Sequence, residues 1–135
     1  MKKVVFIFLN LFLSTLCYSQ SLKFQLSSHI LDIGAGQPAA HVEVKLQKLI
    51  PDKSSWEDMG VRFTDDNGRI NDFLPLSESN KGVYKLTFYT EAYFKQKKTE
   101  TFYPYIEVIF KISGDMHYHV PITLSPYGYS TYRGS

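Results

Sequence analysis

Apolar and polar side chains alternate along most of the chain, with the period of two that indicates strands with one buried face. In residues 22–27 the apolar positions are Leu22, Phe24 and Leu26, and the polar positions between them are Lys23, Gln25 and Ser27. The same alternation occurs in residues 42–47, 84–88, 106–112 and 118–124. Weaker patterns predict two further strands, one at residues 56–63 and a short one from Arg69 onward.

Turn-forming residues separate these stretches, and the chain contains one segment that predicts a helix. Turns are predicted at residues 33–38, 51–55, 65–68 and 113–115. The helix would run for about two turns, with Thr90 as its N-cap, Glu91 near its positive end, and Lys95, Lys97 and Lys98 near its negative end. Seven or eight short strands at regular spacing predict an all-β fold, a β-sandwich of about eight strands in two sheets with one short helix.

The first 19 residues follow a different pattern, which is typical of a cleavable signal peptide. Lys2 and Lys3 precede a mostly apolar run at residues 4–12, and Cys17 and Ser19 are small residues in the places expected before a cleavage site after Ser19. We therefore expect residues 1–19 to be removed after export.

Two alternatives to a cleavable signal are less favoured. A membrane anchor would need ~20 consecutive apolar residues, and the run here is shorter and is interrupted by Asn10. A lipoprotein signal at Cys17 would require a small residue where the bulky Leu16 stands. The expected product is a single domain of residues 20–135, periplasmic or secreted, with no attachment to a membrane.

The charge and cysteine content of this domain exclude other classes. The whole chain has 15 Lys and Arg against 13 Asp and Glu, and the loss of Lys2 and Lys3 leaves 13 of each. A formally neutral domain does not indicate a nucleic-acid-binding surface. The single cysteine lies in the signal peptide, so the remaining 116 residues (135 less 19) must be stabilised by their core, and association of several copies would add stability.

The last 19 residues, 117–135, contain two His, four Tyr, an Arg and a C-terminal Ser, although most chain ends carry little chemistry. In the strand at residues 118–124, alternation predicts one face with Tyr118, Val120, Ile122 and Leu124, and an opposite face with His117, His119, Pro121 and Thr123. Three interpretations remain open: a solvated strand face, a His117–His119 metal pair that would still need more ligands, and a catalytic His119 with partners elsewhere.

Candidate partners for a catalytic His119 are His29, Arg69, Arg133 and Ser135. Two imidazoles can exchange a proton near neutral pH. An arginine can bind a planar anion or stabilise an oxyanion, and a C-terminal serine offers a hydroxyl and a carboxylate together. Each residue also has an ordinary structural explanation, so only the complete set indicates an acid–base site.

Six segments resemble those of the 5-hydroxyisourate hydrolases, the transthyretin-related proteins of urate breakdown. They are SSHILD (27–32), GQPAAHVEVKL (36–46), DNGRI (66–70), FYPYIEVIF (102–110), HYHVP (117–121) and SPYGYSTYRGS (125–135). The terminal Tyr132-Arg133-Gly134-Ser135 is the most specific, because transthyretin itself is similar up to SPY-x-YST and then diverges. By the same resemblance, transthyretin lacks the equivalents of His29, Arg69 and His119.

The resemblance implies a transthyretin-like sandwich that hydrolyses 5-hydroxyisourate to 2-oxo-4-hydroxy-4-carboxy-5-ureidoimidazoline. It implies catalytic roles for His29, Arg69, His119 and Ser135, and substrate binding by Arg69, Tyr132, Arg133 and Ser135. The sites would lie at the dimer–dimer interface of a homotetramer, with no metal or organic cofactor and with neither nucleic acid nor membrane as a partner. Which imidazole is the general base stays open. The alternative functions are an exported transthyretin-like protein that binds a small ligand in the same channel, and a structural or adhesive module.

Overall fold

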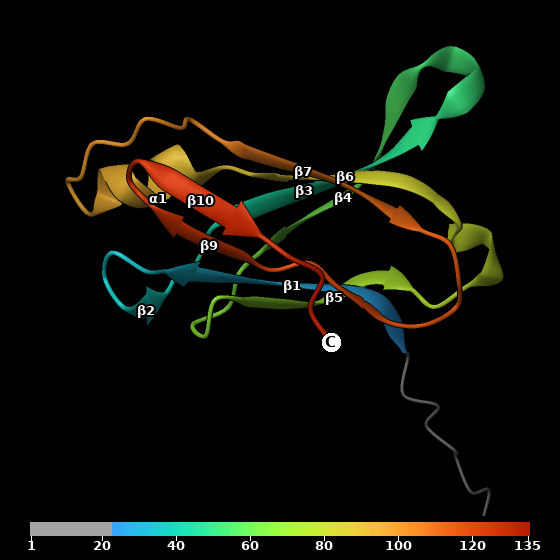
Figure 1. The fold of residues 1–135 in the computed structure, drawn as a ribbon, viewed down its shortest axis with the longest axis horizontal. Helices are drawn as coiled ribbons and strands as arrows, with labels where there is room; N and C mark the ends of the chain where they lie inside the picture. Colours follow the sequence, from blue (N-terminus) through green and yellow to red (C-terminus); the bar gives the residue numbers. More distant parts are fainter. Residues whose placement is uncertain (1–22) are drawn as a thin grey trace, which may run out of the picture.

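The structure is a computed structural model and describes residues 23–135. In this part of the chain, strands form two sheets that pack face to face, with one short α-helix at an end of the sandwich (Figure 1). The prediction of an all-β sandwich with two sheets and one short helix is confirmed. The predicted signal peptide and Leu22 lie outside the described residues.

The first sheet is built around its central strand, β1. Its members are β1 (Phe24–Asp32), β2 (Gln37–Pro38), β5 (Arg69–Pro75), β8 (Tyr118–His119), β9 (Ile122–Ser125) and β10 (Gly128–Thr131). β1 pairs antiparallel with β2 and β5 and parallel with β8 and β9, and β10 extends the sheet antiparallel to β9. The N-terminal and C-terminal segments are thus neighbours in the same sheet.

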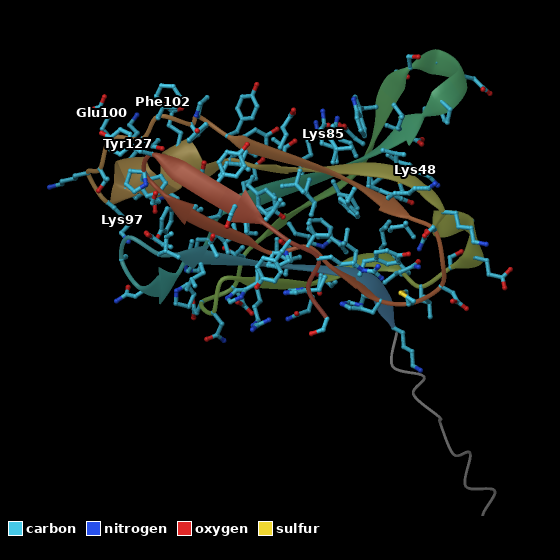
Figure 2. The ribbon with its side chains drawn as sticks, viewed as in Figure 1. Lys48, Lys85, Lys97, Glu100, Phe102 and Tyr127 are labelled. Atoms are coloured by element: carbon cyan, nitrogen blue, oxygen red, sulfur yellow. The ribbon has the colours of Figure 1, made fainter. Side chains whose placement is uncertain are left out.

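The second sheet is antiparallel throughout and lies above the first in Figure 1. Its order is β4 (Ser55–Phe63), β3 (Glu43–Ile50), β6 (Gly82–Phe88) and β7 (Ile106–Ile112). Short 3-10 turns, η1 (Pro51–Lys53) and η2 (Glu78–Asn80), occupy two of the connections. Lys48 and Lys85, labelled in Figure 2, belong to β3 and β6 of this sheet.

The core lies between the sheets and is filled by apolar side chains, some at positions that the alternation identified and others, such as Ile30, beyond the predicted strands. Leu26 and Ile30 come from β1, Leu46 from β3, and Tyr84 and Leu86 from β6, each at most 1% exposed. Burial of a large apolar side chain contributes about 1.5–3 kcal/mol. The core therefore provides the main stabilisation of this domain and buries one face of β1, the central strand of the first sheet.

The helix, α1 (Thr90–Gln96), has the predicted position and length, but the predicted N-cap is wrong. Tyr89 occupies the cap position without a side-chain cap hydrogen bond, and Thr90 lies inside the helix. The Thr90 hydroxyl is buried and has no hydrogen-bond partner among residues 23–135. A tertiary contact helps to hold the helix: Lys97, at the helix end in Figure 2, lies 3.2 Å from the buried carboxylate of Asp32 on β1.

The strand predicted across residues 118–124 is divided in two by Pro121. Proline has no N–H group with which to continue a ladder, so β8 ends at His119 and β9 begins at Ile122. The apolar side chains of both strands, Tyr118 and Ile122 among them, are buried as predicted. Beyond β9 the tail turns back as β10, which the sequence pattern did not identify as a separate strand.

Candidate active site

A tight turn places Arg69 opposite His29. The Asp65 side chain accepts hydrogen bonds from the backbone N–H groups of Asn67 at 2.9 Å and Arg69 at 2.8 Å. Gly68 has a positive φ of 71°, and a Cβ atom there would lie 2.6 Å from the carbonyl oxygen of Ile30. Glycine therefore lets the turn approach β1 closely, and His29 and Arg69 become directly facing residues of the antiparallel β1–β5 pair. Facing side chains in such a pair have Cβ atoms about 5 Å apart.

The parallel pair β1–β8 brings His119 to the same region. Ser27 faces His119 in this pair, and the Ser27 hydroxyl lies 2.8 Å from Nδ1 of the His119 ring. Ser27 and His29 are two residues apart on β1, so they share one face of the sheet at a separation of about 7 Å. His119 and His29 therefore lie near each other on the outer face of the first sheet, with Arg69 beside them.

The C-terminal tail returns to His119 after β10. The backbone N–H of Gly134 donates a 2.9 Å hydrogen bond to the carbonyl oxygen of His119. A Cβ atom on Gly134 would lie only 2.4 Å from Cδ2 of the imidazole, so the tail backbone packs directly on the ring. In Figure 1 the C-terminus, marked C, ends below β1 and β5 in the view, which agrees with this path.

The surroundings favour the neutral form of both imidazoles. Burial is the main cause that lowers the pKa of His119 below the ordinary value of 6.5, and the positive charge of Arg69 is the next cause. Burial followed by Arg69 also lowers the pKa of His29, against weaker opposing effects of the Asn67 backbone and the Asp65 carboxylate. Neutral imidazoles can accept a proton, whereas the permanent charge of Arg69 can bind an anionic oxygen.

The remaining predicted site residues belong to the tail, and Arg133 lines the same hollow as His119 while its guanidinium contacts Tyr118 and Met116. Its guanidinium lies 5.3 Å from the centre of the Tyr118 ring, and one of its nitrogens is 2.9 Å from the sulfur of Met116. Tyr132 is 60% exposed, and Ser135, next to Gly134, is also exposed. In the single chain, therefore, the structure brings His29, Arg69 and His119 together, and the Gly134 end of the tail packs against His119.

Two hollows in the surface include neither His29 nor Arg69. One, of about 770 Å³, is open to solvent beside α1 and is lined mainly by polar and charged side chains such as Lys95 and Glu100. The other, of about 350 Å³, lies between β7 and the tail and is lined in part by His119 and Tyr132. His119 thus lines one of these hollows, whereas His29 and Arg69 face each other on the adjoining β1–β5 pair.

His117 and His119, the two residues considered as a possible metal pair, each have a ring nitrogen at hydrogen-bond distance from Ser27. A ring nitrogen of each faces the Ser27 hydroxyl, at 2.8 Å in both cases. Across residues 23–135, no group of three or more His, Cys, Asp or Glu side chains is arranged to hold a metal ion.

In the same part of the chain, no helix is long and apolar enough to span a membrane.

Ser27 is the member of the site that sequence reasoning missed. Alternation assigned it, with Gln25, to a solvated face, but Ser27 is 6% exposed and Gln25 is fully buried. Gln25 donates to the Gly114 carbonyl oxygen and accepts from Asn80, both at 2.8 Å, so loops cover this part of the face. The sequence feature that could have identified Ser27 is its position two residues before His29, which predicts that both side chains lie on the same face of the strand.

Comparisons with known proteins agree with the fold and with the resemblance to the 5-hydroxyisourate hydrolases. Residues 26–134 match the model of the HIUase/Transthyretin family. A probable 5-hydroxyisourate hydrolase of Caenorhabditis elegans is 44% identical over 132 residues, which cover 97% of this chain and 96% of the relative. The structure of Klebsiella pneumoniae 5-hydroxyisourate hydrolase has a TM-score of 0.70 and 38% identity, covering 82% of this chain and 97% of the other. Sea bream transthyretin in complex with thyroxine has a TM-score of 0.74 and 31% identity, covering 82% and 94%. The chain belongs to the HIUase/Transthyretin family.

Proposed function

We propose that this protein hydrolyses 5-hydroxyisourate to 2-oxo-4-hydroxy-4-carboxy-5-ureidoimidazoline in urate degradation, and that His29, Arg69 and His119 carry the reaction. The hydrolase function is supported by the similarity to the C. elegans relative, named as a probable 5-hydroxyisourate hydrolase, and to the Klebsiella structure, named as a 5-hydroxyisourate hydrolase. The observation that carries the assignment of residues is the cluster itself: two imidazoles with lowered pKa values and one arginine on the same sheet face.

The reaction needs one proton to move from water to a nitrogen atom. A neutral imidazole takes a proton from water, the water oxygen bonds to a ring carbonyl carbon of the substrate, and the C–N bond of the cyclic amide breaks. The leaving nitrogen receives this proton from the imidazolium so formed, so that both histidines are neutral again at the end of the reaction. General acid–base assistance of this kind typically contributes ~10²–10⁴-fold to a rate.

Arg69 and the end of the tail would bind the substrate. The substrate is planar and rich in oxygen, and a guanidinium can donate two parallel hydrogen bonds to such a group and stabilise the developing oxyanion. The Ser135 hydroxyl and the terminal carboxylate would orient the water or the substrate. Direct attack by Ser135 is less favoured, because its position depends on a chain terminus. Roles for Tyr132 and Arg133 as substrate contacts stay predictions.

An open sheet face is poorly suited to hold a small substrate, and this supports a proposed homotetramer. A second pair of subunits packed over the outer face of β1, β5 and β8 would convert it into a closed channel and exclude water. The proposed setting is outside the cytoplasm, in the periplasm or secreted, because residues 1–19 have the pattern of a signal peptide.

The function is tested with freshly prepared 5-hydroxyisourate, which also decays without an enzyme. We expect its disappearance, followed by absorbance, to accelerate in proportion to protein concentration and to give the ring-opened product. A protein that only binds the substrate would leave the decay unchanged or slow it. Unchanged or slowed decay at micromolar protein would therefore contradict the proposed hydrolase activity and favour a small-ligand binding protein.

A further inference from the structure

A continuous chain of hydrogen bonds runs from the backbone of β1 to the ring of His119. Nδ1 of His117 lies 3.0 Å from the carbonyl oxygen of Phe24, and Nε2 of the same ring lies 2.8 Å from the Ser27 hydroxyl. The Ser27 hydroxyl is also 2.8 Å from Nδ1 of His119. Ser27 is 6% exposed, so its two imidazole partners, and not solvent, satisfy its hydroxyl.

The carbonyl at the beginning of this chain determines the direction of every bond when His117 is neutral. A carbonyl oxygen can only accept, so the proton of His117 must be on Nδ1, and its Nε2 must accept. The Ser27 O–H therefore donates to His117. A hydroxyl has a single proton, so Ser27 must accept from His119, and the proton of neutral His119 must be on Nδ1.

The opposite nitrogen of His119 is left with its lone pair. Among the hydrogen bonds of residues 23–135, Nε2 of His119 takes part in none. It is next to Cδ2, the atom on which Gly134 packs, and the ring is close enough to Arg69 and His29 for their charges to influence it.

We propose that Ser27 and His117 are positioning residues that hold His119 in the Nδ1–H tautomer, so that Nε2 of His119 is the general base of the reaction. This inference rests on the proposed function and decides which imidazole takes the proton from water. When Nε2 takes that proton, the ring becomes an imidazolium, and its Nδ1–H bond to Ser27 becomes charge-assisted and stronger. The arrangement therefore stabilises the state in which the proton has moved more than the resting state.

The proposal is tested by the ¹⁵N resonances of the His119 ring at pH 8, because protonated and unprotonated ring nitrogens resonate at well-separated frequencies. In the purified protein we expect a protonated Nδ1 and an unprotonated Nε2. In Ser27→Ala the ring should redistribute toward the Nε2–H form. The same substitution should lower kcat about ten-fold with little change in KM, because Ser27 lies behind the ring and away from the substrate.

Ser28→Ala is the matched control. Ser28 is the next residue of β1, is fully buried, and donates a 2.8 Å hydrogen bond to the Val120 carbonyl oxygen, an acceptor outside the His117–Ser27–His119 chain. This variant should leave the His119 resonances unchanged. A His119 ring protonated on Nε2 in the unmodified protein, or an unchanged tautomer in Ser27→Ala, would overturn the proposal. The spectra are recorded without substrate, so the proposed tautomer and the proposed hydrolase activity are tested independently of each other.

Discussion

At the scale of single residues, the proposed acid–base chemistry depends on the surroundings of His29 and His119, which differ from those of His41. His29 and His119 are half-buried on a strand face beside Arg69, and burial lowers both pKa values. His41 is 72% exposed and pairs with Asp66 at a surface turn, 3.2 Å away. The three residues have the same side chain, and only the fold places two of them together beside Arg69.

The lowered pKa values predict the pH dependence of the reaction. The neutral base is required, so kcat/KM should decline as the pH falls, and the midpoint of this decline should lie below 6.5, the ordinary histidine value. The positive charge of Arg69 is the second cause of the shift, so the decline should move to higher pH in Arg69→Gln. A pH series of kcat/KM measures both effects, and a midpoint at or above 6.5 in the unmodified protein would contradict the burial argument.

At the scale of the elements, the site depends on three connections between strands. The turn of residues 65–68 aligns Arg69 with His29, the parallel β1–β8 pair aligns Ser27 with His119, and the tail after β10 reaches His119 through Gly134. The turn was predictable, because Asn67-Gly68 is a local turn signal in the sequence and Gly68 readily adopts the positive φ that the turn requires. The alignment of β8 beside β1 was not, because it joins segments about 90 residues apart.

The limits of the sequence pattern are clearest at Ser27 and Thr90. Alternation correctly identified the core face of β1, but it could not indicate that loops near Gly114 and Asn80 cover part of the opposite face. Thr90 is a residue type that is preferred at the N-cap, yet the N-cap position of the helix is one residue earlier, at Tyr89. The family motifs predicted that His29, Arg69 and His119 belong to one site. The fold brings these three residues together and places Ser27 and His117 beside His119.

The contact between Gly134 and the His119 ring predicts the effect of one added methyl group. In Gly134→Ala the new Cβ would meet Cδ2 at 2.4 Å and Cγ at 3.1 Å, so the tail or the ring must move. We expect kcat/KM to fall on the order of ten-fold or more, since small displacements of catalytic groups are costly, while the melting temperature changes little.

Gly128→Ala provides the comparison for this tail substitution. Its Cβ would lie 3.7 Å from the Ser125 hydroxyl oxygen, an ordinary contact at the beginning of β10. It should retain near-normal activity. Equal activity in Gly134→Ala and Gly128→Ala, measured with the same substrate preparation, would refute the view that the tail positions His119.

At the scale of the whole molecule, both sheets end on the same side of the sandwich. β7 is the last strand of one sheet and β10 of the other, and a hollow lies between β7 and the tail. Ile109 on β7 is 61% exposed, and Tyr129 on β10 is 42% exposed. Unpaired strand edges with exposed apolar side chains are suited to pairing with a second copy of the chain.

The proposed assembly predicts a mass of four chains by light scattering at micromolar concentration. Ile109→Lys should shift the protein toward smaller species and reduce activity, because a charge would be buried at the β7 edge. Met59→Lys is the control, since Met59 is 41% exposed on β4 at the other edge of the same sheet. A fully active monomer would contradict a site that needs neighbouring subunits.

The most direct test of the catalytic cluster compares histidine substitutions that differ only in location. kcat/KM for 5-hydroxyisourate would be measured for His29→Ala, His119→Ala and His41→Ala, each with its melting temperature as a check on folding. We expect the first two to lose about 10²-fold or more, and His41→Ala to retain near-normal activity, because its ring pairs with Asp66 at the surface. Normal activity in folded His29→Ala and His119→Ala would contradict the assignment of the acid–base chemistry to these two side chains.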